Sequence, residues 1–221
     1  SISDSQRRPL PWCNWQNTVY HGLPHDLYKF HPEPGKYLAF LGRVSPEKCP
    51  DQAIELAKRV GIPMKMAAKV DPADRAYFER VVEPLLDHPL IEFVGEITDA
   101  EKSDFIGNAI GLICPYDWPE PFGLVLIESL ACGTPVLAYR RGSIPEIIGH
   151  GVTGFISENL DEMVSQVDKL GTIDRNRCRQ VFDERFTAQR MTTDYVKIYQ
   201  QLITDAAALP GKSGQQHASN L

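Results

Sequence analysis

The chain contains 221 residues, of which 43% are apolar and 24% are charged, and its formal net charge is −6. This apolar content is enough for a hydrophobic core, and the length fits one large domain or two small ones. A negative net charge argues against a general nucleic-acid binder or a cationic membrane-surface protein. No apolar run approaches the roughly 18–20 residues of a membrane helix. We therefore expect a soluble protein that does not bind nucleic acid.

The five cysteines are scattered along the chain without any Cys-x-x-Cys pair. A disulfide framework or a structural zinc site requires paired or clustered spacing, so neither is predicted. Unpaired cysteines are typical of a reducing compartment, and we expect a cytoplasmic protein. His21 and His25 have the i, i+4 spacing of a helical metal pair. The glycine and the proline between them prevent a helix, so no metal site is expected there.

The first 36 residues are rich in proline and aromatic residues, which is typical of an extended lead-in or linker. From Tyr37 onward, short apolar runs alternate with helical segments, the pattern of an α/β protein with a parallel sheet. Five strands are predicted, at residues 37–41, 64–70, 91–94, 110–114 and 136–139. The main domain is expected to span residues 37–205.

Helix starts are marked by Asp71 before Pro72, and by Thr98 with Glu101 three residues later, which predicts a capping box. After Phe155 the pattern becomes helical. The predicted helices lie at residues 160–170, 175–186 and 187–205. Residues 206–221 have the composition of a disordered tail.

The segment from Glu120 to Cys132 carries the most informative pattern. On a helical wheel, the apolar side chains from Leu124 to Cys132 cover every side, which predicts a buried helix. Glu128 lies inside this apolar wheel, and a buried carboxylate without partners is costly. Two interpretations are open: a salt bridge to a neighbouring arginine or lysine, or hydrogen bonds from the hydroxyls of a bound ribose.

Gly123 comes directly before this predicted helix, and the N–H groups at a helix start suit an anionic or electron-rich ligand. In open parallel sheets, ligands lie outside the carboxyl ends of the strands. The loop after residues 110–114 is at such an end. Glu120 lies in this loop between two prolines, and taken alone it reads as a solvated loop residue.

A second group of polar residues follows the first predicted strand. Gly42 permits close backbone approach, Arg43 can bind phosphate oxygens with two hydrogen bonds, and Lys48 supplies a compact positive charge. Taken alone, this segment is better interpreted as a solvated turn with a helix cap at Ser45.

Together these motifs resemble the family 4 (group 1) glycosyltransferases of GT-B architecture. The resemblance rests on GRVSPEK at 42–48, FVGEI at 93–97, the E-x7-E element EPFGLVLIE at 120–128, ACGTPV at 131–136, and RGSIPEII with GVTGF ending at 155. It covers roughly residues 18–204 and corresponds to the C-terminal, donor-binding half of the family. It implies a Rossmann-like, doubly wound parallel sheet followed by C-terminal helices.

The resemblance also implies a role for each matching position. Arg43 and Lys48 would bind the diphosphate of a nucleotide-sugar donor, and Glu128 would hold the ribose hydroxyls. Glu120 would contact hydroxyls of the transferred sugar, so the catalytic candidates are Glu120, Arg43 and Lys48. The other donor-binding candidates are Gly42, Ile97 at a position that touches the base, and Phe122, Gly123 and Leu124, whose backbone would line the sugar and phosphate.

The implied reaction transfers a hexose from a UDP-, GDP- or ADP-sugar to an acceptor, with retention at the anomeric carbon. No cofactor is implied, and the absence of an Asp-x-Asp motif predicts a reaction without metal. Gly142 and Glu146 match a shared motif, but no contact is assigned to them.

Family members carry a further Rossmann-like domain that precedes this one and binds the acceptor. Here the segment SISDSQRR at residues 1–8 resembles the last strand of that domain, and residues 1–36 would be its remnant with the interdomain linker. We expect this chain to need its own N-terminal domain as a partner and to be inactive alone. A peripheral membrane contact of the full enzyme would come through that missing half.

Three other classes of protein compete with this interpretation. A nucleotide-sugar 2-epimerase shares the two-domain architecture and differs in its product. A catalytically silent nucleotide-sugar binding module is also compatible, although the intact E-x7-E element with both cations weighs against it. A receiver-type or flavodoxin-type domain gives no reason for Glu128.

Overall fold

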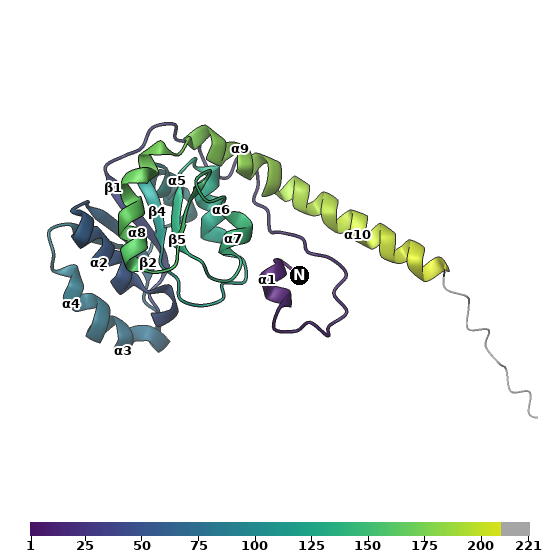
Figure 1. Ribbon diagram of the computed structural model, residues 1–221, viewed down its shortest axis with the longest axis horizontal. Coiled ribbons are helices and arrows are strands. Elements are labelled where there is room, and N and C mark those ends of the chain that lie inside the picture. The colour runs from purple at the N-terminus through teal and green to yellow at the C-terminus, as the bar shows by residue number, and fades with distance from the viewer. Residues whose placement is uncertain (209–221) are drawn as a thin grey trace, which may run out of the picture.

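Six parallel strands form one sheet in the computed structural model, which describes residues 1–208 (Figure 1). The strands are β1 (Tyr37–Arg43), β2 (Met64–Lys69), β3 (Ile91–Gly95), β4 (Ala109–Cys114), β5 (Val136–Tyr139) and β6 (Gly154–Ser157). Their order across the sheet is β3-β2-β1-β4-β5-β6, and every neighbouring pair is parallel. The order changes direction between β1 and β4, so the carboxyl ends of these strands flank a topological switch point. The predicted α/β, Rossmann-like, doubly wound fold is confirmed.

Helices cover both faces of the sheet. The α-helices of the described residues are α1 (Asp4–Arg7), α2 (Pro50–Val60), α3 (Arg75–Tyr77), α4 (Glu83–Leu86), α5 (Asp99–Gly107), α6 (Leu124–Ala131), α7 (Ile144–Ile147), α8 (Leu160–Gln166), α9 (Arg175–Arg185) and α10 (Ala188–Ala208), of which α1 and α10 do not lie on the sheet (Figure 1). The chain steps outward from β1 to β2 in one direction and from β4 to β5 in the other. Because crossovers in parallel sheets are right-handed, α2 and α6 cover opposite faces. Helix α8 packs on α2, and α9 packs on α6.

The core lies between these helix layers and the central strands. Every residue of β5 and all but one of β4 are buried, as expected for parallel strands that helices cover on both faces. The largest fully buried side chains include Phe40, Leu38, Ile54, Met66, Leu112, Ile113, Tyr116, Phe182 and Phe186.

The five predicted strands are confirmed, with bounds shifted by no more than two residues. The sixth strand, β6, is missing from the prediction because it has only four residues and begins with a glycine. The predicted helix starts are also confirmed. The Asp71 carboxylate accepts the Ala73 N–H at 3.1 Å, and the Glu101 carboxylate accepts the Thr98 N–H at 2.7 Å.

The three C-terminal helices also form, with two differences from the prediction. The first is α8, which continues as a 3₁₀ segment over Val167–Thr172. The last is α10, which extends away from the body of the domain (Figure 1) and runs to Ala208 instead of ending at residue 205. Residues 206–208 of the predicted tail are therefore helical, and residues 209–221 lie outside the described residues.

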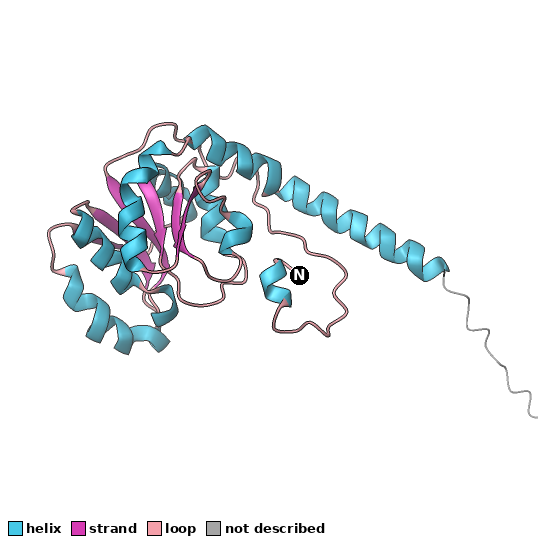
Figure 2. Cartoon of the chain, in the orientation of Figure 1, coloured by secondary structure: helices cyan, strands magenta, loops and turns pink. Residues whose placement is uncertain are grey.

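Most of residues 1–36 is loop, as predicted (Figure 2). The expectation of a strand at residues 1–8 is wrong, because Asp4–Arg7 forms the short helix α1. Three N–H groups at the start of this helix have no partner within the helix, and each donates to a side chain instead. The Ser3 hydroxyl accepts the N–H of Gln6 at 3.0 Å, and the Glu146 carboxylate accepts the N–H groups of Asp4 and Ser5 at 2.8 and 2.7 Å. These acceptors favour a helix over an extended segment.

Arg175 joins the lead-in to the core. Its guanidinium, buried at 6% exposure, donates to the carbonyl oxygens of His31, Gly107 and Ala109 at 2.8, 2.7 and 3.0 Å. It also donates to the Thr134 hydroxyl at 2.7 Å. An arginine with this many donors can satisfy several buried acceptors at once. This residue therefore fixes the start of the sheet against the segment that leads into it.

Candidate functional site

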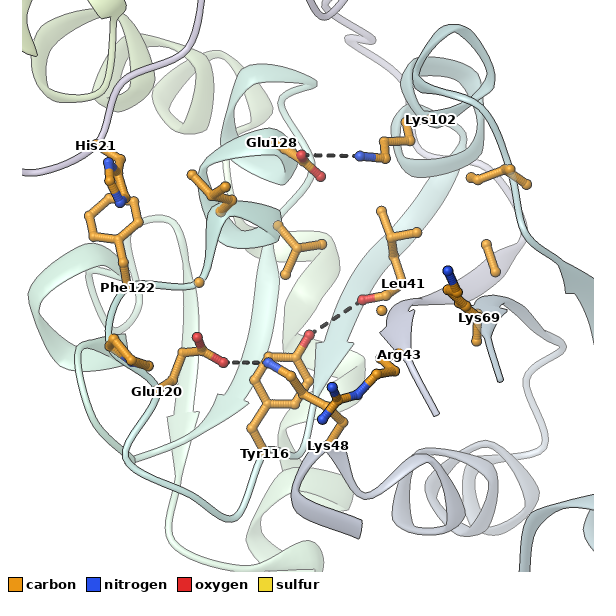
Figure 3. Close-up of a pocket in the computed structure, with 18 of the residues that line it drawn as sticks. His21, Leu41, Arg43, Lys48, Lys69, Lys102, Tyr116, Glu120, Phe122 and Glu128 are labelled. Carbon is orange, nitrogen blue, oxygen red and sulfur yellow. Dashed lines mark hydrogen bonds and ion pairs between the residues drawn. The ribbon is translucent and has the colours of Figure 1, made fainter. Parts of the chain in front are cut away.

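A cavity of about 590 Å³ opens at the carboxyl ends of the central strands (Figure 3). This is the topological switch point, where α/β sheets bind ligands. All nine residues predicted to bind a donor line this one cavity: Gly42, Arg43, Lys48, Ile97, Glu120, Phe122, Gly123, Leu124 and Glu128. They come from three separate stretches of the chain, so only the fold brings them together. Their contacts with a donor remain a prediction.

Lys48 and Glu120 form an ion pair between the loop after β1 and the loop after β4 (Figure 3). Both side chains are largely buried, with 19% and 10% of their area exposed. The Lys48 ammonium also lies 3.9 Å from the centre of the Tyr116 ring, a cation–π distance. Trp118 donates its indole N–H to the same Glu120 oxygen at 3.0 Å. Glu120 is therefore a buried, partnered carboxylate and not a solvated loop residue.

The segment after β5 packs against the loop that carries Glu120 and hydrogen-bonds to its backbone. The backbone N–H of Ser143 donates to the Glu120 carbonyl, and its hydroxyl donates to the Phe122 carbonyl, both at 2.9 Å. Gly142 has a left-handed φ of +54°, and a Cβ there would lie 2.3 Å from the backbone N and O of Glu120. Gly142, to which the sequence assigned no contact, is therefore required for this close approach.

Glu146, also left without a contact, faces the N-terminal segment. Its carboxylate accepts two backbone N–H groups of α1 and, at 3.2 Å, the hydroxyl of Tyr20. Its role in the structure is to fasten the lead-in to the domain.

Glu128 lies on α6 with 8% of its area exposed and lines the cavity. Its Oε1 is 3.4 Å from the Lys102 ammonium, which also pairs with Asp99 at 2.9 Å. Burial lowers the pKa of Lys102, but the Asp99 hydrogen bond and the Glu128 charge outweigh burial and raise it. The salt-bridge interpretation of Glu128 thus has its partner. The ribose interpretation remains open as well, since both members of the pair line the cavity.

Arg43 is the most exposed predicted cation, at 50% of its side-chain area, and pairs with Glu47 at 2.6 Å and Asp74 at 3.3 Å. These pairs hold the guanidinium at the mouth of the cavity. Lys69, at the end of β2, is the register partner of Arg43 and lines the same cavity.

Sequence reasoning missed Lys69 and Lys102. Lys69 falls within a predicted strand next to the strand that ends at Arg43, and Lys102 lies in the first turn after the predicted capping box. Strand adjacency was the signal for Lys69, but it becomes usable only when the strand order is known.

Helix α6 begins at Leu124, directly after Gly123 with its φ of +80°. Gly123, Leu124 and Val125 line the cavity, so the start of the helix, where N–H groups lack partners within the helix, lies at the cavity. The prediction that this helix is buried on all sides is wrong for Leu124, which is 48% exposed because it lines the cavity.

His21 also lines the cavity, with its ring packed edge-on against Phe122 at 5.0 Å between centres. Burial lowers the pKa of His21, which favours the neutral ring.

No cluster of three or more histidine, cysteine, aspartate or glutamate side chains able to hold a metal occurs in residues 1–208. None of the helices in this part of the chain has the length and apolar character needed to cross a bilayer.

Residues 28–181 match the family model described as glycosyl transferases group 1. The match covers well over half of the chain, and the chain belongs to this family. The resemblance found in its motifs is thereby confirmed.

Among curated proteins, an N-acetyl-alpha-D-glucosaminyl L-malate synthase of Bacillus anthracis is 37% identical over 94 residues, which cover 39% of this chain and 25% of that protein. A D-inositol 3-phosphate glycosyltransferase of Mycobacterium marinum is 29% identical over 140 residues, covering 61% of this chain and 30% of that protein. The chain thus aligns with less than a third of the length of either relative.

Among solved structures, AviGT4, a glycosyltransferase of avilamycin A biosynthesis, superposes with a TM-score of 0.76 at 20% identity, covering 92% of this chain and 63% of that one. HepE from Anabaena, in complex with UDP and glucose, superposes with a TM-score of 0.69 at 20% identity, covering 87% and 57%. At this identity the likeness establishes the fold, which is the fold of GT-B glycosyltransferases.

Proposed function

We propose that this chain is the donor-binding domain of a retaining glycosyltransferase that transfers a hexose from a nucleotide diphosphate sugar to an acceptor. The observation that carries the proposal is that nine predicted residues from three separate motifs line one cavity at the switch point of the sheet. The two curated relatives are named as an N-acetyl-alpha-D-glucosaminyl L-malate synthase and a D-inositol 3-phosphate glycosyltransferase, and HepE is also solved in complex with UDP-glucose.

The cavity offers a distinct surface to each part of such a donor. In the proposed arrangement, the base lies against Ile97 and the ribose hydroxyls donate to Glu128. The diphosphate lies between Arg43, Lys48 and the start of α6, where fixed positive charge and free N–H groups meet. The sugar then faces Glu120 and the backbone of residues 122–124.

The chemical task is to stabilise the negative charge that develops on the departing diphosphate. Arg43 and Lys48 would meet this charge at the cavity, where Arg43 is held by Glu47 and Lys48 lies beside the Tyr116 ring. Lys48 would leave Glu120 for the diphosphate, which frees the Glu120 carboxylate to accept hydrogen bonds from the sugar. The acceptor and the rest of the catalytic machinery would come from an N-terminal domain.

Binding of nucleoside diphosphates to this chain tests the proposal. We expect UDP, GDP or ADP to raise the melting temperature, and calorimetry to give an affinity that Lys48→Ala weakens about tenfold or more, the worth of a charged hydrogen bond. Arg59→Ala is the matched control, because Arg59 pairs on the surface with Glu55 and Asp161 and does not line the cavity. Failure of all three nucleotides to bind, or equal effects of the two variants, would contradict the proposal. Product analysis of the enzyme joined to its N-terminal domain would separate glycosyl transfer from 2-epimerisation of the donor.

A further inference from the structure

Trp118 is a half-buried residue in the loop between β4 and α6, two positions before Glu120. It is absent from the set of residues that line the cavity. We therefore expect Trp118 to act on a bound donor through a neighbour.

That neighbour is Glu120. The indole N–H of Trp118 donates to Oε2 of Glu120 at 3.0 Å, and this is the oxygen that also holds Lys48. No hydrogen bond reaches Oε1 from any residue between 1 and 208. Figure 3 shows this second oxygen turned away from Lys48. The carboxylate is thus fixed through one oxygen and free through the other.

We propose that Trp118 is a positioning residue that orients the Glu120 carboxylate toward the sugar of the donor. The inference rests on the proposed function and deepens it. When Lys48 turns to the diphosphate, Glu120 loses its ionic partner while it is still largely buried. A buried carboxylate needs a hydrogen-bond donor to stay ionised and fixed. The indole supplies that donor throughout, because it is outside the cavity and does not exchange partners with the ligand.

The indole ring has a second, weaker contact, with the Lys48 ammonium 5.3 Å from its centre. A phenylalanine at this position retains an aromatic ring beside Lys48 but cannot donate a hydrogen bond. Trp118→Phe therefore separates the hydrogen bond to Glu120 from the contact with Lys48.

The test compares the affinities of a nucleoside diphosphate and of its sugar conjugate, measured by calorimetry on the 221-residue chain. The probes are UDP with UDP-glucose, GDP with GDP-mannose, and ADP with ADP-glucose. We expect Trp118→Phe to leave the affinity for the nucleotide within about twofold and to weaken the sugar conjugate about tenfold, the worth of one hydrogen bond to a charged group. Trp15→Phe is the matched control. Its indole also donates one hydrogen bond, to the Leu10 carbonyl at 2.8 Å, but in the lead-in and outside the cavity.

A double-mutant cycle with Glu120→Ala distinguishes positioning from a general structural role. If Trp118 acts through Glu120, then Trp118→Phe has no further effect on the sugar conjugate once the carboxylate is gone. Unchanged preference for the sugar conjugate in Trp118→Phe, or equal losses with and without Glu120, would overturn the inference and leave the proposed function standing. A wild-type chain that binds none of the six probes would overturn both. Equal wild-type affinity for nucleotide and conjugate would overturn the inference alone.

Discussion

The Lys48 ammonium and the Glu120 carboxylate neutralise each other across the cavity, and each is a group that the resemblance assigns to the donor. The pair joins the loop after β1 to the loop after β4. In the proposed arrangement these two oppositely charged groups bind different parts of one ligand, and in the free protein they pair with each other. The proposed donor binding separates them, and this gives the first prediction.

Glu120→Gln should tighten the binding of a nucleoside diphosphate, although Glu120 is itself a predicted binding residue. The amide leaves Lys48 without a competing anion, so less free energy is needed to release the ammonium. An ion pair with limited exposure contributes on the order of 1 kcal/mol, which corresponds to roughly fivefold in affinity. Calorimetry with UDP, GDP and ADP measures the change.

Glu96→Gln is the control for this prediction. It removes one negative charge from the lining of the same cavity, and Glu96 has no ion pair in the described part of the chain. An equal gain of affinity in both variants would attribute the effect to net charge. Weaker binding in Glu120→Gln would mean that the Lys48–Glu120 pair does not restrain Lys48.

Glu128→Gln should reduce nucleotide affinity about tenfold while changing the melting temperature by only a few degrees. The amide keeps the shape of the side chain, and Lys102 keeps its pair with Asp99. The amide accepts hydrogen bonds from ribose hydroxyls more weakly than the carboxylate does. Thermal unfolding and calorimetry on the same preparation measure both quantities. A large drop in melting temperature with unchanged affinity would instead assign Glu128 to the structural salt bridge.

Gly142→Ala should abolish measurable nucleotide-sugar binding. A methyl group there collides with the backbone of Glu120 at 2.3 Å, so the loop that carries Glu120 and Phe122 must move. Gly151→Ala is the matched control, because Gly151 also has a positive φ, +75°, but has no atom within 4 Å of an added Cβ. It carries only the conformational cost, roughly 1 kcal/mol. Equal binding by the two variants would show that the contact behind the loop is dispensable.

Arg175→Met should destabilise the fold by about 3 kcal/mol or more. The methionine retains the apolar stem but leaves the three carbonyl oxygens of His31, Gly107 and Ala109 without their donor. Urea unfolding followed by circular dichroism gives the free energy of unfolding. Arg177→Met is a suitable control, since Arg177 pairs with Glu184 on the exposed face of the same helix. A loss in Arg175→Met no larger than in the control would refute the role given to Arg175.

The sequence predicts the central part of the fold well because the hydrophobic periodicity of strands and helices and the capping of helix ends depend on residues close together in the chain. The strand at Val136–Tyr139 and the capping box at Thr98 depend on neighbouring residues, and both form as expected. Helix α1 was not predicted, since its first N–H groups are satisfied by Glu146, which lies 142 residues from Asp4 in the chain.

The candidate site divides in the same way. The motifs around Arg43 and Glu128 are contiguous in the sequence, so they can be recognised by their resemblance to the family's motifs. The place of Lys69 in the site depends on the order of the strands. The support of the Glu120 loop by Gly142 and Ser143 depends on contacts between loops that are distant in the sequence. Such contacts produce no periodic pattern in the sequence, so the folded structure is needed to find them.

The most direct measurement is a crystal structure of the chain soaked with the nucleoside diphosphate that most raises its melting temperature. We expect the nucleotide in the cavity at the carboxyl ends of β1 and β4, with ribose hydroxyls within hydrogen-bond distance of Glu128. We also expect the Lys48 ammonium to contact a phosphate oxygen instead of Glu120. A nucleotide bound elsewhere, or one that leaves both side chains in their present pairs, would contradict it.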